Sequence, residues 1–216
     1  MERARQEIVD LGRRMSSEGL SKGTSGNLSA YDPEIGYMAI SPSGIGYFDT
    51  EVNDVVIMTL HGMIVEGDRK PSSEHGLHAA FYKNKPDAQG VVHTHSNYCT
   101  TFACLNMPIK AVHYVIGGAG AAEIPCAEYA TFGTAELALN AVKACGASSA
   151  VLLANHGLVT CGPSLAKAFS LAVDVEYVAE IQWRAMCVGK PVIISDEEMD
   201  HVMKEFKNYG QPQKGK

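Results

Sequence analysis

The chain has 216 residues, of which 46% are hydrophobic, and its formal net charge at pH 7 is −6. This length suffices for one substantial hydrophobic core, so we expect a single domain over residues 1–216. The negative charge argues against a nucleic-acid or anionic-membrane surface, because neither attracts an acidic protein at long range. Any phosphate group must therefore be held by local contacts.

We expect no signal for export or membrane insertion in this chain. Its first residues are charged, and no apolar run is long enough to span a bilayer, so we expect a cytoplasmic protein. The six cysteines are scattered without a C-x-x-C pair. Such spacing favours reduced thiols over a disulfide framework, and it excludes a zinc site built from cysteine pairs.

The first half of the chain predicts a mixed arrangement of helices and antiparallel strands. Apolar residues recur at helical spacing between residues 8 and 15, and Gly19 is placed to end that helix. The apolar runs at 55–60 and 63–65 flank His61-Gly62 and predict a hairpin, which favours a mixed or antiparallel sheet. The other expected elements are a loop at 21–27, a strand at 37–40, a loop at 41–46, a helix at 74–83 capped by Ser72 or Ser73, a strand at 90–95 and a helix at 96–105.

The second half continues this alternation. Thr134 is placed to cap a helix that runs to residue 143. The apolar strand at 150–154 leads into a tight turn at His156-Gly157, and the sheet continues beyond it. Further on we expect a long helix opened by Pro163 and running to about residue 188, a capping box at 195–198 before the last helix, and a mobile tail at 207–216.

Two histidines stand two positions apart in the apolar segment that ends at His95. Side chains two apart on a strand share a face, so the imidazoles of His93 and His95 converge. Catalytic zinc usually takes three protein ligands, and His156 is the best third candidate, because it ends another strand before a glycine that permits a sharp turn. Three hydrogen-bonded core histidines fit the same pattern, which leaves both interpretations open.

Glu74 falls in the first turn of a predicted helix. An acidic residue there complements the helix dipole, an effect worth about 0.3–1 kcal/mol. Close to a bound metal, the same carboxylate could instead ligate the ion or remove a proton beside a polarised carbonyl. Sequence spacing does not decide between these roles.

Three loops combine glycines and hydroxyls in the manner of phosphate-binding loops. Residues 23–27 read Gly-Thr-Ser-Gly-Asn, and Ser43-Gly44 repeats the combination. Ser72 and Ser73 add the free N–H groups of a helix N-terminus, which can bind an anion without a lysine or arginine. Each loop taken singly also fits an ordinary turn or cap.

Taken together, these segments resemble the class II aldolase/epimerase family, and within it most closely the members that cleave L-fuculose 1-phosphate. The resemblance runs essentially end to end and depends on the order of the motifs. They are Gly-Thr-Ser-Gly-Asn at 23–27, Ser-Pro-Ser-Gly at 41–44, Ser-Ser-Glu at 72–74, His-Thr-His at 93–95, His-Tyr at 113–114, Ile-Pro-Cys-Ala-Glu-Tyr-Ala-Thr-Phe-Gly-Thr at 124–134, His-Gly at 156–157 and Phe-Lys-Asn-Tyr-Gly at 206–210.

The resemblance implies a fold, an assembly and a set of ligands. The subunit would be a three-layer α/β/α domain around a central, mostly antiparallel mixed sheet, and the subunits would form a cyclic homotetramer with active sites at their interfaces. One Zn²⁺ per subunit would be bound by His93, His95 and His156. The substrate phosphate would be bound by Thr24, Gly26, Asn27, Ser43, Gly44, Ser72 and Ser73.

The resemblance also implies a reaction, the cleavage of a ketose 1-phosphate, by default L-fuculose 1-phosphate, into dihydroxyacetone phosphate and L-lactaldehyde. Zinc would polarise the ketone, and Glu74 would be the base in the condensation direction. Tyr114 from a neighbouring subunit would protonate the aldehyde oxygen. The alternative is a purely structural Tyr114, with a buried ring and a hydrogen-bonded hydroxyl. Phe132 and Tyr209 would orient the aldehyde.

Three other functions belong to the same fold. The resembling L-ribulose-5-phosphate 4-epimerases carry an acidic residue just before the tyrosine that corresponds to Tyr114, and this chain has His113 there, which favours the aldolase. The motifs do not separate an aldolase from a related sugar-phosphate dehydratase or decarboxylase. A non-catalytic interaction domain of the adducin type lacks the three zinc histidines that this chain keeps.

Overall fold

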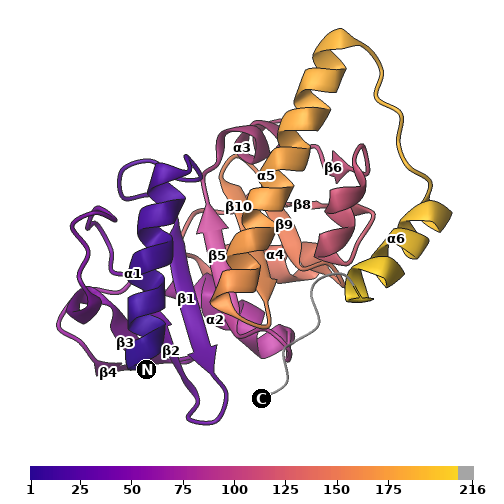
Figure 1. Ribbon diagram of the computed structural model, residues 1–216. Coiled ribbons are helices and arrows are strands. Elements are labelled where there is room, and N and C mark those ends of the chain that lie inside the picture. Colours follow the sequence, from indigo (N-terminus) through magenta and orange to yellow (C-terminus); the bar gives the residue numbers. More distant parts are fainter. Residues whose placement is uncertain (209–216) are drawn as a thin grey trace.

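A computed structural model describes residues 1–208 and shows a central sheet flanked by helices (Figure 1). Within this part, every pair of neighbouring strands in the main sheet is antiparallel except β8 and β9, which are parallel. The mostly antiparallel mixed sheet expected from the sequence is therefore confirmed. In spatial order its strands are β4 (Ile64–Glu66), β3 (Val56–Thr59), β2 (Tyr37–Ile40), β1 (Asn27–Asp32), β5 (Gly90–Thr94), β10 (Gly157–Gly162), β9 (Ala150–Leu153) and β8 (Cys126–Ala127).

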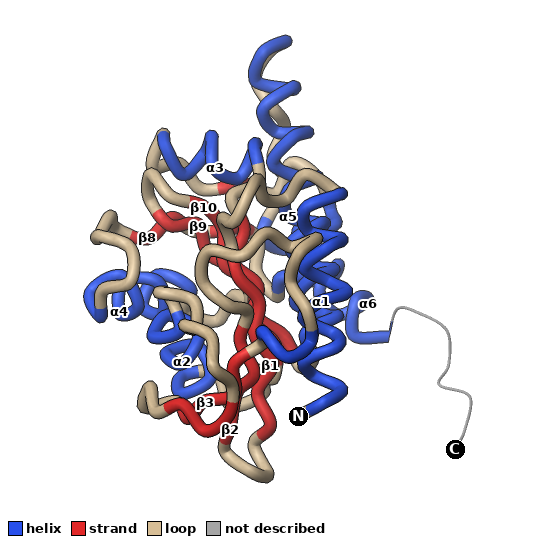
Figure 2. Tube along the Cα trace, turned by 90° about the vertical axis from the view of Figure 1, so that its left-hand side faces the viewer, coloured by secondary structure: helices blue, strands red, loops and turns tan. Residues whose placement is uncertain are grey.

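Helices cover both faces of this sheet, as the side view shows (Figure 2). One face carries α1 (Glu2–Ser17), α3 (Asn97–Cys104) and α5 (Leu165–Val188), and the other carries α2 (His75–Asn84) and α4 (Ala135–Cys145). The 3₁₀ segment η2 (Tyr114–Ala119) packs against α5, and α6 (Asp196–Asn208) packs against η2. The remaining elements are the 3₁₀ segment η1 (Val52–Asp54) and a small pairing of β6 (Ile109–Lys110) with β7 (Glu123–Ile124).

The alternation of side chains along the strands builds one hydrophobic core on each face. On β5, Val92 packs with the α1 and α5 side of the sheet, whereas Val91 packs with the α2 and α4 side. Phe169 of α5 in one core and Phe81 of α2 in the other are among the largest fully buried side chains. Because both faces are covered, the residues of β5, β9 and most of β10 are buried, and packing on both sides holds the ends of these strands.

Several expected element boundaries agree with the structure. The first helix ends as predicted, with Gly19 in the left-handed region at φ 76°. Thr134 caps α4 by accepting a hydrogen bond from the Leu137 N–H at 3.2 Å. The longest helix starts at Leu165 after a Ser164 cap, slightly later than the expected start at Pro163.

One expectation about local structure was wrong, and strand β1 was not expected. The helix expected at 74–83 begins at His75, and its N-cap position is held by Glu74, not by Ser72 or Ser73. The Ser72 hydroxyl instead accepts the Glu74 N–H at 3.2 Å, which holds the turn before the helix. Strand β1 was missed, because the segment Asn27–Asp32 is only half apolar and becomes a strand by pairing with β2 and β5 on either side.

Within residues 1–208, no helix is both long and apolar enough to cross a bilayer. The end of the chain from residue 209 lies outside the described residues. Tyr209 and most of the tail expected at 207–216 therefore lie outside the described residues.

Candidate active site

The candidate site lies at one end of the sheet, where β5 ends and both β1 and β10 begin. The strand register brings chain segments that are far apart in sequence into contact there. Asn27 is paired with His93, and Val159 pairs with His93 from the other side. The start of α2 adds Glu74 to the same place.

Three histidine rings converge at this end. The Nε2 atom of His93 lies 3.0 Å from Nε2 of His95 and 3.2 Å from Nε2 of His156. One nitrogen from each ring falls within 4.8 Å of the others, which makes the group a candidate metal site. The predicted convergence of His93 and His95 is therefore present, although His95 lies just beyond the last residue of β5.

The hydrogen bonds and burial of the rings suit a metal ligand set. His93 Nδ1 lies 2.9 Å from the Leu158 carbonyl oxygen, which only accepts, so Nδ1 carries the hydrogen and Nε2 presents its lone pair to the cluster. Burial lowers the pKa of His93 to about 3, and it also lowers the pKa values of His95 and His156. Neutral imidazoles of this kind are the ligands that zinc and similar divalent ions prefer.

Glu74 lies beside this cluster. Its Oε2 is 3.3 Å from His93 Nε2, and its Oε1 is 3.6 Å from His156 Nε2. Burial raises the pKa of Glu74, but attraction to His93 and a hydrogen bond from Asn27 outweigh that effect and lower it overall. Among the described residues, buried Oε1 has no hydrogen-bond partner. An unpaired carboxylate oxygen beside three imidazole nitrogens fits a divalent cation bound between them.

The turn that presents His156 differs from the expected one in its backbone. The left-handed residue is Asn155, at φ 55°, while Gly157 is already the first residue of β10. Gly157 is needed for a different reason, because a Cβ atom there would lie 2.3 Å from the Thr94 carbonyl oxygen. The glycine therefore allows β10 to approach β5 closely, and Asn155 makes the turn.

A cavity of about 340 Å³ opens beside Glu74, His95 and His156. Its lining includes hydroxyl and amide groups from three separate loops. All seven residues predicted to bind phosphate line it, namely Thr24, Gly26, Asn27, Ser43, Gly44, Ser72 and Ser73. The loops at 41–44 and 70–73 are held together, because Ser43 N–H donates to the Lys70 carbonyl and Ser72 N–H to the Ser41 carbonyl.

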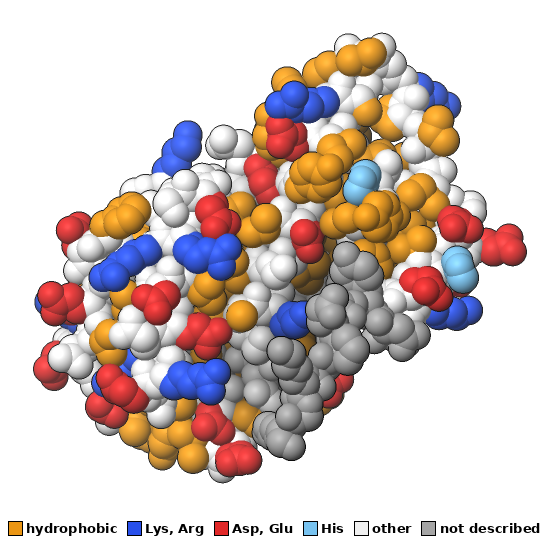
Figure 3. Space-filling model, in the orientation of Figure 1, with side chains coloured by type: hydrophobic (Ala, Val, Ile, Leu, Met, Phe, Trp, Pro, Cys, Tyr) orange, Lys and Arg blue, Asp and Glu red, His pale blue; other side chains and the backbone are white. Residues whose placement is uncertain are grey.

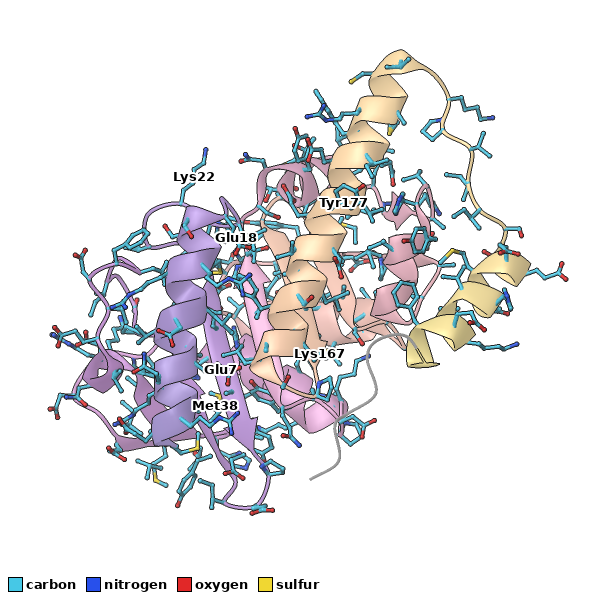
Figure 4. All side chains as sticks on the ribbon, viewed as in Figure 1. Glu7, Glu18, Lys22, Met38, Lys167 and Tyr177 are labelled. Atoms are coloured by element: carbon cyan, nitrogen blue, oxygen red, sulfur yellow. The ribbon has the colours of Figure 1, made fainter. Side chains whose placement is uncertain are left out.

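No lysine or arginine within residues 1–208 lines this cavity. Lys22, in the loop that leads to the site, projects away into solvent (Figure 4). An anion in the cavity would therefore depend on neutral hydroxyl and N–H donors and on the N-terminus of α2.

The remaining predicted residues are divided between two places. Phe132 lines the main cavity together with Tyr129 and Asn155, which the sequence did not single out. The sequence did contain a signal for the turn at Asn155, because asparagine tolerates the left-handed backbone region and here it directly precedes His156-Gly157. Tyr114 lines a separate cavity against α6 instead, is 54% exposed and stacks on Phe206 with ring centroids 6.3 Å apart.

Known proteins resemble this chain in sequence and in fold. An L-fuculose phosphate aldolase of Escherichia coli K12 is 41% identical over 95% of this chain and 94% of its own. A 5-deoxy-D-ribulose 1-phosphate aldolase of Bacillus thuringiensis serovar kurstaki is 43% identical over 98% of this chain and 99% of its own. Among solved structures, an L-fuculose 1-phosphate aldolase superposes with a TM-score of 0.92 at 44% identity, covering 94% of this chain and 96% of that one.

The family model described as "Class II Aldolase and Adducin N-terminal domain" matches residues 6–183. That range includes the three histidines, Glu74 and every residue of the polar cavity wall. The chain therefore belongs to the class II aldolase family.

Proposed function

We propose that this protein is a zinc-dependent aldolase that cleaves a ketose 1-phosphate into dihydroxyacetone phosphate and a short aldehyde. The observation that carries the proposal is the position of Glu74. Its carboxylate lies within 3.6 Å of two of the three clustered histidines and lines a cavity rich in hydroxyl and amide donors. A base beside a metal site and a phosphate cradle is the arrangement that this chemistry requires.

The three histidines would hold the ion, which when bound would act as a Lewis acid on the substrate's carbonyl oxygen. Glu74 supplies the base, because its lowered pKa keeps it ionised at neutral pH. In the condensation direction it accepts the proton from the carbon next to the carbonyl, and in the cleavage direction it returns that proton. Asn27 holds one carboxylate oxygen in place at 2.9 Å.

The cavity is lined by polar loops and by two aromatic rings, and these two groups suit the two ends of such a substrate. The loops around Thr24, Ser43 and Ser73 supply neutral donors for a phosphate. Tyr129 and Phe132 are aromatic and more than 60% exposed, and they face the same cavity. A short aldehyde with an apolar end fits beside these rings.

We take L-fuculose 1-phosphate as the first substrate candidate and a 5-deoxypentulose 1-phosphate as the second. The second is favoured by the relative named 5-deoxy-D-ribulose 1-phosphate aldolase, which matches 98% of this chain at 43% identity. An epimerase is less favoured. His113, at the position of the expected epimerase acid, is used locally, because its Nδ1 accepts the Val115 N–H at 3.4 Å and its ring packs on Tyr177.

The proposal includes a homotetramer in which Tyr114 acts in the site of a neighbouring subunit. Tyr114 is exposed, and it faces α6 rather than the cavity of its own chain. Hydrophobic side chains gather on the surface over α5, η2 and α6 (Figure 3), and exposed Tyr177, Trp183 and Met186 belong to this region. A surface of this kind is typical of a subunit contact.

The test is a panel of ketose 1-phosphates and ketose 5-phosphates, with release of dihydroxyacetone phosphate as the readout. L-Fuculose 1-phosphate, 5-deoxyribulose 1-phosphate and L-ribulose 5-phosphate separate the two aldolase candidates from the epimerase. Loss of release after chelation, with recovery on addition of Zn²⁺, supports metal dependence. Interconversion of pentulose 5-phosphates without release of a triose phosphate would contradict the proposal.

A further inference from the structure

A chain of buried polar side chains leads from Glu74 into the protein interior between β1 and α2. Asn27 Nδ2 donates to Glu74 Oε2 at 2.9 Å, and Asn27 Oδ1 lies 2.5 Å from His78 Nε2. His78 Nδ1 lies 2.6 Å from Ser29 Oγ, which lies 2.6 Å from the Tyr82 hydroxyl. Each of the five residues is at most 6% exposed. We refer to them as the Glu74–Tyr82 chain.

Helix and strand periodicity together build this chain. Glu74, His78 and Tyr82 follow one another at four-residue intervals at the start and along one face of α2. Asn27 and Ser29 lie two positions apart on β1 and therefore face the same side of the sheet. The two sets of side chains interleave, so hydrogen bonds join α2 to β1 along the whole chain.

The direction of each hydrogen bond follows from the first one. Because the Asn27 NH₂ group faces Glu74, its carbonyl oxygen faces His78, and that oxygen has no hydrogen to give. The Nε2 atom of His78 must therefore carry a hydrogen. Burial lowers the pKa of His78 to about 4, so the ring is neutral and its bare Nδ1 accepts the Ser29 hydroxyl hydrogen.

The chain ends at Tyr82. The Ser29 hydroxyl donates its hydrogen to His78, so the Tyr82 hydroxyl is the donor toward Ser29. The Tyr82 hydroxyl oxygen lies 2.6 Å from Ser29 Oγ and 2.9 Å from the Ser29 carbonyl oxygen. The Tyr82 ring is held in turn by stacking on Tyr31, with centroids 5.0 Å apart. Each hydrogen bond from Glu74 to Tyr82 therefore has a defined donor and a defined acceptor.

We infer that His78 is a positioning residue whose Nε2–H fixes the orientation of the Asn27 amide, and through it the rotamer of Glu74. If the amide were rotated by 180°, its NH₂ would face the His78 N–H and its oxygen would face the Glu74 carboxylate. Both contacts would be repulsive. In the observed orientation Asn27 holds Oε2, and Oε1 is left without a hydrogen bond beside His156. The catalytic part of this inference rests on the proposed function, in which Glu74 is the base.

The first test compares two substitutions at His78 with a control. His78→Gln keeps an N–H donor near the Nε2 position, whereas His78→Leu has a similar size and no donor. Thr160→Val is the matched control, because it removes a buried hydroxyl that donates to the Ala168 carbonyl and lies outside the Glu74–Tyr82 chain. The readout is the rate and KM of C–H exchange of dihydroxyacetone phosphate in deuterated water, with zinc content measured on each variant.

We expect His78→Leu to lower the limiting exchange rate at least roughly tenfold with KM changed less than about threefold, because orientation of a base affects the chemical step more than binding. His78→Gln should recover most of this loss, and Thr160→Val should exchange at close to the wild-type rate. A residue that only fills the core would not give rescue by Gln. Wild-type exchange in a folded, zinc-loaded His78→Leu protein would overturn the inference.

The second test does not depend on activity. In ¹⁵N-histidine NMR spectra, His78 should show the Nε2–H tautomer with a bare Nδ1, and these signals should vanish in His78→Gln. His93 should show the opposite tautomer, because its Nδ1 faces the Leu158 carbonyl. An Nδ1–H tautomer at His78 would refute the orientation argument. If wild-type protein failed to exchange dihydroxyacetone phosphate, the proposed function would fail, and the tautomer would then decide by itself whether His78 orients Asn27.

Discussion

His93 and His156 are 63 positions apart in the chain, yet their Nε2 atoms lie 3.2 Å from each other. The pairing of β5 with β10 produces this contact, because Thr94 faces Leu158 and the turn before β10 carries His156 back over the end of β5. The three-histidine cluster is therefore a property of the sheet, and it is held by rigid strands on both sides.

Removing one ligand should remove the metal. We expect His156→Ala to lose most of its zinc on dialysis against a weak chelator while keeping its fold, because the half-buried His156 ring ends a turn at the edge of the core. Metal analysis of the dialysed protein is the measurement. His61→Ala, which removes an exposed histidine, is the control and should keep one zinc per chain. Full retention of zinc by His156→Ala would eliminate the proposed ligand set.

Removing the base should stop proton transfer without stopping binding. Glu74→Gln keeps the shape of the side chain but cannot accept a proton, so we expect turnover to fall by roughly two to four orders of magnitude. Binding of dihydroxyacetone phosphate, measured by calorimetry, should change little. Glu34→Gln, at an exposed carboxylate, is the matched control. Wild-type exchange of the C–H proton in Glu74→Gln would show that another group is the base.

A negative charge in the phosphate cradle should weaken substrate binding. Ser73 is exposed at the cavity wall, just before α2, so Ser73→Asp should be tolerated by the fold. We expect KM for the sugar phosphate to rise about tenfold or more, because the new carboxylate repels the phosphate. Ser17→Asp, at an exposed position of α1, controls for the change in net charge. An unchanged KM in Ser73→Asp would indicate that phosphate binds elsewhere.

The proposed sharing of sites between subunits can be tested by complementation. Tyr114→Phe and Glu74→Gln should each be nearly inactive alone. If every site takes Glu74 from one chain and Tyr114 from its neighbour, randomly mixed tetramers of the two variants should regain about a quarter of wild-type activity, since one adjacent pairing in four restores both groups. Co-expression with two affinity tags provides the hybrids. Hybrids that stay inactive would place both residues in the site of the same chain.

His78 should make the metal-free protein acid-sensitive. Burial lowers its pKa from 6.5 to about 4; attraction to Glu74 raises the pKa in part, and repulsion from His75 adds to the lowering. Between these pH values the unfolded chain binds a proton that the folded chain does not, so the free energy of unfolding falls as the pH falls. The slope from this group is up to ~1.4 kcal/mol per pH unit.

Urea unfolding of wild-type and His78→Gln proteins at pH 7, 6 and 5 measures this effect. The pKa of His93 is also lowered, and this contributes equally to both proteins. The difference between their slopes of unfolding free energy against pH therefore isolates His78. Parallel slopes for the two proteins would show that His78 is not buried in its neutral form.

The sequence by itself determined the mixed sheet, most helices and the identity of the clustered histidines. These features depend on short-range rules, such as the side-chain alternation that turns His93 and His95 to one side, and the Thr134 cap of α4. The polar character of the loops around Thr24, Ser43 and Ser73 also follows directly from their amino-acid composition.

Only the tertiary structure decided which of these groups meet. The pairing of β1 with β5 places Asn27 opposite His93, and the N-cap position of Glu74 turns its carboxylate toward the histidines rather than along the helix dipole. His78 had no distinguishing signal, because its importance depends on Asn27, 51 positions away on another element. Long-range pairing of strands and helices is set by the packing of both faces of the sheet, and no local pattern encodes it.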